Sequence, residues 1–311
     1  MTYRDIRGWL VAVALIGGVV WPSPAAAQAC GGTCAQIPKA QGAIISWWPL
    51  DSSGKDIVGS NTGVVIGGAF QAGEVCSAFN SLGVANRIRV APAPTLNVTT
   101  FTVEGWVRLD PPLNQFNPIM VWKGASAANV STSFGLGVLG TSAGPNARTM
   151  WGLISDGVTW QFIPAAKLSF GAFTHVALTA DGAQFCLYVN GAPTCIPQTL
   201  TPRTTTSDLV IGALNNNQNW WNGLIDEVTL YNRALDQTEI QAIKTAGTAG
   251  KCRCTEVAHY FQQKLAAANA TIAAQQAEIG SLQSRLDALH GPPGARGAAL
   301  PADVATPDRP D

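Results

Sequence analysis

The side chains best suited to bind a ligand lie in residues 215–222, which read NNNQNWWN. Flat aromatic rings beside amide groups suit the apolar faces and polar edges of sugars. We therefore expect a loop that binds carbohydrate there. Its candidate ligand contacts are the side chains of Trp220, Trp221, Asn217 and Asn219.

Paired carboxylates for catalysis are harder to find. Hydrolysis of a glycan needs two carboxylates a few ångströms apart, usually on alternate residues of one strand, and no Glu-x-Asp-x-Glu string occurs. The nearest acidic pair, Asp226 and Glu227, is adjacent in sequence, so we expect its side chains on opposite faces of a strand. The sequence therefore favours a protein that is not an enzyme.

The composition excludes partners that are recognised by strong charge. Only 12% of the 311 residues are charged, and Lys plus Arg equal Asp plus Glu at 19 each. Soluble domains usually carry about 25% charged residues. Because no basic field exists to attract phosphates, we expect no nucleic-acid partner.

The N-terminus is typical of an export signal, which we assign to residues 1–29. Two arginines precede an apolar run over 9–20, and Ala-x-Ala follows at 25–27 and again at 27–29, so cleavage after Ala27 or Ala29 is expected. The run is short for a membrane span, so the mature protein is expected outside the cell or in the periplasm. A membrane anchor, or acylation of Cys30, is the alternative.

Export makes the seven cysteines interpretable as disulfides. Asn190-Gly191 is a strong signal for a two-residue hairpin, and closing the turn there places Cys186 opposite Cys195. That pair falls on a position without ladder hydrogen bonds, where the Cα atoms approach most closely, so we predict a Cys186–Cys195 disulfide.

The other cysteines flank the main body of the chain, except for one inside it. They are Cys30, Cys34, Cys76, Cys252 and Cys254. We expect at least one bridge between the N-terminal and C-terminal groups, because the ends of a domain usually lie close together. Zinc binding by the four flanking thiols is the alternative.

Residues 30–41 form a linker, and residues 42–247 then show strand-length runs separated by turn residues, without intervening helices. This pattern, with Gly at 32 and Pro at 19, predicts an all-β sandwich of two antiparallel sheets. In its last strand, even-numbered residues 224–230 should face one side and odd-numbered residues 225–231 the other. Asp236 with Glu239, flanked by Leu235 and Ile240, then predicts a capped helix that ends near Gly247.

A second element follows the Cys-x-Cys linker at 248–254. Residues 255–290 keep apolar residues at heptad positions a and d, with Gln275 as the polar exception, which predicts a helix and a homo-oligomeric coiled coil. The alternative is a helix that packs on its own sandwich. Residues 291–311 are rich in Pro, Gly and Ala and are expected to be a disordered tail.

Four segments, in order, resemble one family. They are ISWWPLD at 45–51, FTVEGWVRLD at 101–110, FTHVALTADGAQFCLYVNG at 173–191 and NGLIDEVTLYNRALDQTEI at 222–240. Together they are similar to bacterial laminin G-like, concanavalin A-like jelly-roll domains over roughly 42–247. The resemblance implies a jelly-roll sandwich and makes His175 a structural residue. It also offers a second interpretation of the tryptophans before Asn222, as packing residues.

The resemblance further implies a calcium ion at the rim. It suggests Asp226 as a ligand, facing the early loop that carries Asp51 or Asp56, since calcium prefers hard oxygen ligands from separate segments. The alternative is that Asp226 is a buried hydrogen-bond acceptor.

These observations combine into one functional hypothesis. We expect a secreted, non-catalytic, lectin-like module that binds a glycan or a cell-surface partner and is oligomerised by its C-terminal helix. The alternatives are a structural or adhesin-type protein-interaction module without a sugar site and, third, a glycan-active hydrolase.

Overall fold

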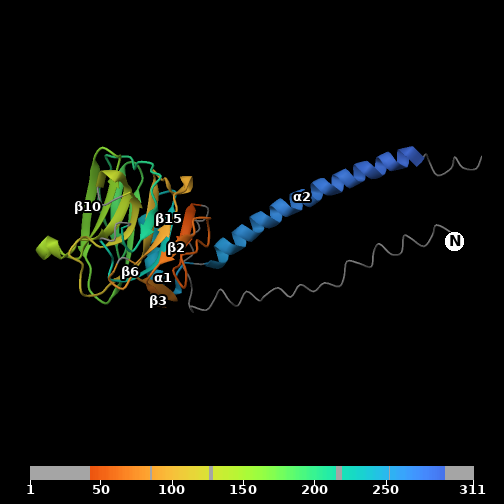
Figure 1. Ribbon diagram of the computed structural model, residues 1–311. Helices are drawn as coiled ribbons and strands as arrows, with labels where there is room; N and C mark the ends of the chain where they lie inside the picture. The colour runs from red at the N-terminus through yellow and green to blue at the C-terminus, as the bar shows by residue number, and fades with distance from the viewer. Residues whose placement is uncertain (1–42, 85, 126–128, 215–218, 252, 291–311) are drawn as a thin grey trace, which may run out of the picture. The chain divides into compact units, whose positions relative to one another are not determined.

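The computed structural model describes residues 43–84, 86–125, 129–214, 219–251 and 253–290, of which the side chains at 253–267, 287, 289 and 290 are excluded (Figure 1). The chain divides into two units, residues 1–256 and 257–311, which are described separately. The expected signal peptide and C-terminal tail lie outside the described residues.

The first unit is a sandwich of two sheets, as predicted (Figure 1). In spatial order, the eight-stranded sheet contains β13 (Ala192–Pro197), β12 (Gln184–Val189), β11 (Phe173–Ala180), β6 (Phe101–Leu109), β15 (Gly223–Tyr231), β4 (Ser77–Asn80) and β3 (Ala69–Ala72), with β1 (Ile44–Trp48) also paired to β15. The seven-stranded sheet contains β10 (Trp160–Lys167), β9 (Thr149–Ser155), β8 (Thr132–Val138), β7 (Ile119–Gly124), β14 (Leu209–Ile211), β5 (Arg87–Val90) and β2 (Gly63–Ile66). Their ladders are antiparallel, which confirms the fold class of the sandwich.

Three clusters of buried residues stabilise the sandwich. The largest lies between the sheets and includes Trp48, Phe101, Phe134, Leu136 and Trp221. A second joins the outer face of the eight-stranded sheet to α1 (Gln237–Ala246), and a third, with Trp122 and Trp151, covers the outer face of the seven-stranded sheet. Apolar side chains are thus buried on both faces of each sheet.

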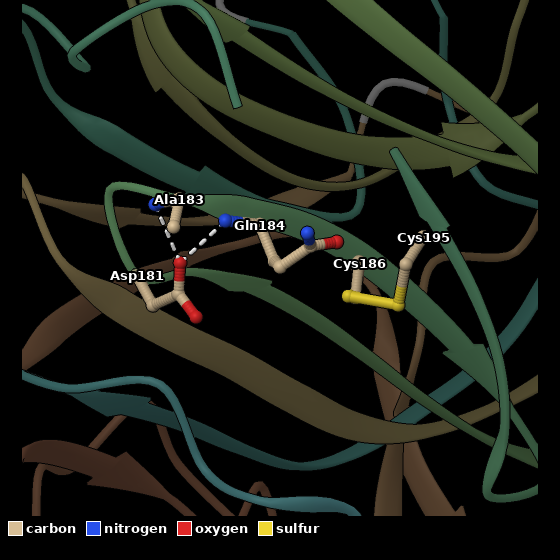
Figure 2. Close-up of a disulfide and its surroundings, with 5 residues drawn as sticks. All are labelled: Asp181, Ala183, Gln184, Cys186 and Cys195. Carbon is tan, nitrogen blue, oxygen red and sulfur yellow. Dashed lines mark hydrogen bonds between the residues drawn. A yellow bond between two sulfur atoms is a disulfide. The ribbon is translucent and has the colours of Figure 1, made fainter. Parts of the chain in front are cut away.

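The β12–β13 hairpin has the predicted register. Val189 pairs with Ala192 and Cys186 with Cys195, whose sulfur atoms form a disulfide across a Cα–Cα distance of 4.1 Å (Figure 2). At the preceding turn, the Asp181 carboxylate accepts hydrogen bonds from two backbone N–H groups (Figure 2). Cys76 is also disulfide-bonded. The Cys186–Cys195 prediction is confirmed.

The strict alternation predicted for β15 is wrong. Asp226 pairs with Trp106 and Thr229 with Glu104, so the strand carries one extra residue, a β-bulge at Glu227 with φ of 57°. The bulge places Ile225 and Val228 in the same core although their numbers differ in parity. A bulge of this kind has no obvious signature in a run of eight well-patterned residues.

The helix after β15 follows the prediction closely. The Asp236 carboxylate accepts from the Glu239 backbone N–H at 2.9 Å, and the Glu239 carboxylate accepts from the Asp236 N–H at 3.0 Å. Leu235 and Ile240 are buried together on the sheet, and Gly247 follows the last turn. The capping box and hydrophobic staple are therefore confirmed.

The C-terminal element is a single helix, α2 (Arg253–His290). Its apolar heptad residues Ile272, Ile279, Leu282 and Leu286 are each about half exposed in the single chain. The helix is confirmed, whereas its association into a coiled coil stays a prediction. Among the described residues, no helix is both long enough and apolar enough to cross a membrane.

Candidate functional site

A rim pocket of about 610 Å³ opens where the ends of β4 and β6 meet the start of β15. It is lined by Leu82, Gly83, Pro111, Pro112, Leu113, Asn114, Gln115, Phe116, Trp220 and Asn222. Leu82 and Phe116 are about half exposed, and Trp220 is partly exposed. The pocket therefore offers apolar and aromatic surface to solvent between polar backbone and amide groups.

Asparagine side chains hold the loops of the rim pocket together. The Asn114 carboxamide accepts from the Phe116 N–H at 3.0 Å and donates to the Trp220 carbonyl at 3.3 Å. The Asn222 amide donates to the carbonyls of Asp110 and Pro112. Because these amides donate hydrogen bonds to carbonyls of neighbouring loops, the pocket is organised before any ligand binds.

Two close backbone approaches brace the same loops. A Cβ at Gly140 would lie 2.1 Å from the Phe116 carbonyl oxygen, and one at Gly223 would lie 2.1 Å from that of Arg108. Gly223 also has φ of 131°, which L side chains rarely adopt. A side chain at either position would push the rim loops apart.

The structure separates the four predicted ligand contacts. Trp220 lines the rim pocket, and Asn219 next to it donates its amide to the Asn117 carbonyl at 2.9 Å. Trp221 is fully buried in the main core, where its indole N–H donates to the Arg108 carbonyl at 3.0 Å. Its assignment as a ligand contact is therefore wrong, since consecutive residues here point to opposite sides. Asn217 lies outside the described residues.

The three carboxylates assigned to calcium do not gather at one point. Among the described residues, no group of three or more His, Cys, Asp or Glu side chains is arranged to hold a metal. Asp56 instead accepts hydrogen bonds from the backbone N–H groups of residues 47, 58, 59 and 61, so it organises the loop after β1. We therefore remove Asp56 from the calcium assignment.

Asp226 and Asp51 do come close to each other. Burial, followed by the charges of Glu227 and Asp51, raises the pKa of Asp226 well above its ordinary value. One oxygen of Asp226 accepts from the Val75 N–H at 2.8 Å, while Oδ1 has no partner within the described part of the chain. A buried carboxylate with an unused oxygen fits either a proton or a cation with oxygen ligands.

A second polar cluster lies on the outer face of the eight-stranded sheet and was missed from the sequence. Glu104 on β6 receives hydrogen bonds from His175 Nε2 on β11 at 3.0 Å and from the Tyr231 hydroxyl at 3.2 Å. Glu227 receives one from the Trp47 indole at 2.9 Å. His175 is buried and bonded, as its structural assignment implied.

Lys251 completes this cluster from the far end of the unit. Its ammonium lies 3.1 Å from Glu104 Oε1 and 3.3 Å from Glu227 Oε2, and 4.9 Å from the centre of the Trp47 ring. Lys251 is 5% exposed, although it lies in the segment 248–254 that the sequence predicts to be a linker. The sequence carries one signal for it, an isolated lysine between glycine and cysteine, and that signal is too weak to interpret.

Burial also changes the interpretation of the adjacent acidic pair. The bulge directs Asp226 and Glu227 to the same outer side of the sheet, so the expectation of opposite faces is wrong. Both side chains are fully buried.

One Gly-x-Ser-x-Gly string does occur, at 140–144, so the sequence does not lack this nucleophile pattern. Residues 141–144 of the string lie on a short 3-10 helix, whereas a nucleophile elbow is a strand-to-helix turn. His175 is buried against Glu104.

Comparison with solved structures shows the fold. The binding domain of Paraclostridial Mosquitocidal Protein 1 matches 67% of this chain and 53% of its own, at 14% identity and a TM-score of 0.52. Trypanosoma rangeli sialidase matches 69% of this chain and 36% of its own, at 18% identity and a TM-score of 0.51. The fold rests on these two structures. A third, less similar one is domain 4 of an extracellular arabinanase from Geobacillus stearothermophilus, in complex with arabinotriose, which matches 64% of this chain and 96% of its own at 17% identity and a TM-score of 0.49.

Sequence comparison gives the family. No curated protein matches the chain. The family model for concanavalin A-like lectins and glucanases matches residues 82–241, just over half of the chain, and this region contains the rim-pocket residues 82–83, 111–116, 220 and 222. The chain therefore belongs to the concanavalin A-like lectin/glucanases superfamily.

Proposed function

We propose that this protein is a secreted, non-catalytic module that binds carbohydrate in the rim pocket. The observation that carries the proposal is a preorganised pocket in which exposed aromatic and aliphatic groups, Phe116, Trp220 and Leu82, lie between amide and carbonyl groups. Sugars present apolar C–H faces and polar edges, and such a lining is complementary to both. The Cys186–Cys195 disulfide is in keeping with an exported protein.

Binding by variants of matched tryptophans tests the proposal. Trp220→Ala should weaken glycan binding about thirtyfold, because loss of a central aromatic contact costs on the order of 2 kcal/mol. Trp160→Ala is the control, since Trp160 is also partly exposed but lies on β10, away from the rim pocket. Equal binding by both variants would refute the site. Absence of glycan binding by the folded wild type would favour a protein-interaction module.

The exposed heptad residues of α2 support a role in oligomerisation. A pairing of the Ile272, Ile279 and Leu286 faces between copies would bury these apolar side chains. Several weak sugar sites on one oligomer gain avidity without new contacts. Sedimentation of the full chain should give a multimer and a chain that ends at Lys251 a monomer; a monomeric full chain would remove the coiled coil.

Calcium is the cofactor we propose for the Asp226 site. Asp226 and Asp51, with neighbouring backbone carbonyls, would hold the ion, which would neutralise a buried carboxylate and tie β15 to the loops beside it. Calcium should then raise the melting temperature of chelator-treated protein. In Asp226→Asn this response should disappear while the hydrogen bond from the Val75 N–H is kept. If calcium does not change the melting temperature of the wild type, the ion is refuted and Asp226 is a protonated side chain that accepts the hydrogen bond from the Val75 N–H.

A further inference from the structure

We propose that the rim pocket selects neutral glycans and discriminates against acidic ones such as sialylated or uronic-acid-containing chains. This inference rests on the proposed function, carbohydrate binding in the rim pocket. It concerns the class of sugar, and its argument starts from the charges that surround the pocket.

Among the described residues, the lining of the rim pocket carries no ionisable side chain. Its ten residues are glycine, proline, aliphatic, aromatic or amide residues. The segments that adjoin it in sequence but lie outside the described residues, Ala85 and residues 215–218, are also uncharged in the sequence. A ligand carboxylate in the pocket would therefore face no cation from either source.

The nearest cation in sequence, Arg108, is already paired. Its guanidinium donates two hydrogen bonds to the Asp110 carboxylate, at 3.0 and 2.8 Å, and lies over the Phe173 ring at 5.7 Å. Bidentate arginine–carboxylate pairs are among the stronger charge-assisted contacts in proteins. A ligand carboxylate would have to compete with Asp110 for this guanidinium.

Binding of an acidic sugar is therefore weakened by a free-energy cost that binding of a neutral sugar does not have. A carboxylate loses water on entering a pocket, and without a paired cation this desolvation is not compensated. Sugar hydroxyl groups can instead hydrogen-bond to uncharged carbonyl and amide groups. Gln115, which is exposed on the pocket wall, presents an amide of this kind.

The packing of the rim loops keeps this neutral character fixed. The backbone of residues 114 and 115 accepts hydrogen bonds from Thr141 and Ser142, so the wall that carries Gln115 is braced from behind. Because the wall is braced, the uncharged backbone and the Gln115 side chain keep their place beside a ligand. Selectivity should therefore belong to the pocket itself and not to a mobile side chain.

The test compares matched glycans, each measured with and without terminal sialic acid, by calorimetry on the full-length wild-type protein. We expect the neutral member of a pair to bind at least about tenfold more tightly, with little dependence on salt. Gln115→Arg should bring the sialylated member within a few-fold of the neutral one. Gln71→Arg, at an exposed position on β3, is the control for added charge and should leave the preference unchanged.

The outcomes separate this inference from the proposed function. Equal or tighter binding of sialylated glycans by the wild type would overturn the selectivity and leave carbohydrate binding intact. A preference that moves equally in both arginine variants would show that net charge, and not the pocket, sets the selectivity, which also overturns the inference. Failure to bind either member of every pair, by protein with normal thermal unfolding, would overturn the proposed function as well.

Discussion

Replacement of Lys251 by methionine should destabilise the sandwich strongly at neutral pH. The change keeps most of the side-chain volume but removes a buried ammonium from between Glu104 and Glu227, 3.1 and 3.3 Å away. Removal of one partner from a buried ion pair costs about 3–5 kcal/mol, because the remaining charge has lost its compensation. For a unit of this size that corresponds to a melting temperature lower by about 6–20 °C.

The pH dependence follows from the same contacts. Burial alone would raise the pKa of Glu104, but the charge of Lys251, followed by the hydrogen bond and charge of His175, holds it below its ordinary value. In the wild type, the stability that Glu104 contributes is present above its unfolded pKa and is lost as the pH falls through the lower folded pKa. Without Lys251, burial is opposed only by His175, so the pKa of Glu104 should rise and its carboxyl should take up a proton at a higher pH. The destabilisation by Lys251→Met should therefore shrink as the pH is lowered from 7 to 4.

The assay is urea unfolding with the disulfides intact, followed by tryptophan fluorescence at several pH values. Lys55→Met is the matched control, because Lys55 is exposed and its loss should change the free energy of unfolding by less than about 0.5 kcal/mol. A double variant with Glu104→Gln should lose less than the sum of the two single changes. A loss below about 1 kcal/mol for Lys251→Met at pH 7, or one that does not vary with pH, would refute the reasoning.

Three further predictions concern elements of the sandwich. Joint replacement of Cys186 and Cys195 by serine should lower the free energy of unfolding by about 2–3 kcal/mol, as expected for release of a loop with a sequence separation of 9; an unchanged urea midpoint would contradict this. Asp236→Ala should cost about 1 kcal/mol through loss of the helix cap, measured by thermal unfolding, with Asp236→Asn as the nearly neutral control. Trp221→Ala should cost about 3–5 kcal/mol, against less than about 1 kcal/mol for the pocket residue Trp220, and equal losses would mean that the two rings are not on opposite sides.

Local signals with their own chemistry could be predicted from the sequence. The Cys186–Cys195 pair follows from a two-residue turn and a ladder that counts outward from it. The helix at Asp236 likewise follows from a cap that needs only four consecutive residues to form. These features depend on contacts close in sequence, and so their geometry is fixed before tertiary packing enters.

Features that depend on distant partners could not be predicted. The bulge at Glu227 leaves the hydrophobic pattern almost unchanged, yet it redirects Asp226 and moves Val228 into the core. Lys251 is buried because its ammonium forms ion pairs with carboxylates on β6 and β15, and the residues next to it in sequence give no indication of these partners. The different positions of Trp220 and Trp221 have the same cause, because the sequence of a loop does not show which of two adjacent side chains is buried.

The placement of β15 and Lys251 has a consequence for how the chain folds during synthesis. β15 ends at Tyr231, yet it pairs with β1, β4 and β6 in the middle of its sheet, and β1 begins at Ile44. The ribosome must therefore release nearly the whole sandwich before this sheet can close, and contacts between such distant segments form slowly. Until Lys251 emerges, the two buried carboxylates also lack their cation. The nascent chain should accordingly not complete the sandwich until Lys251 has left the ribosome, and should then close in one late step.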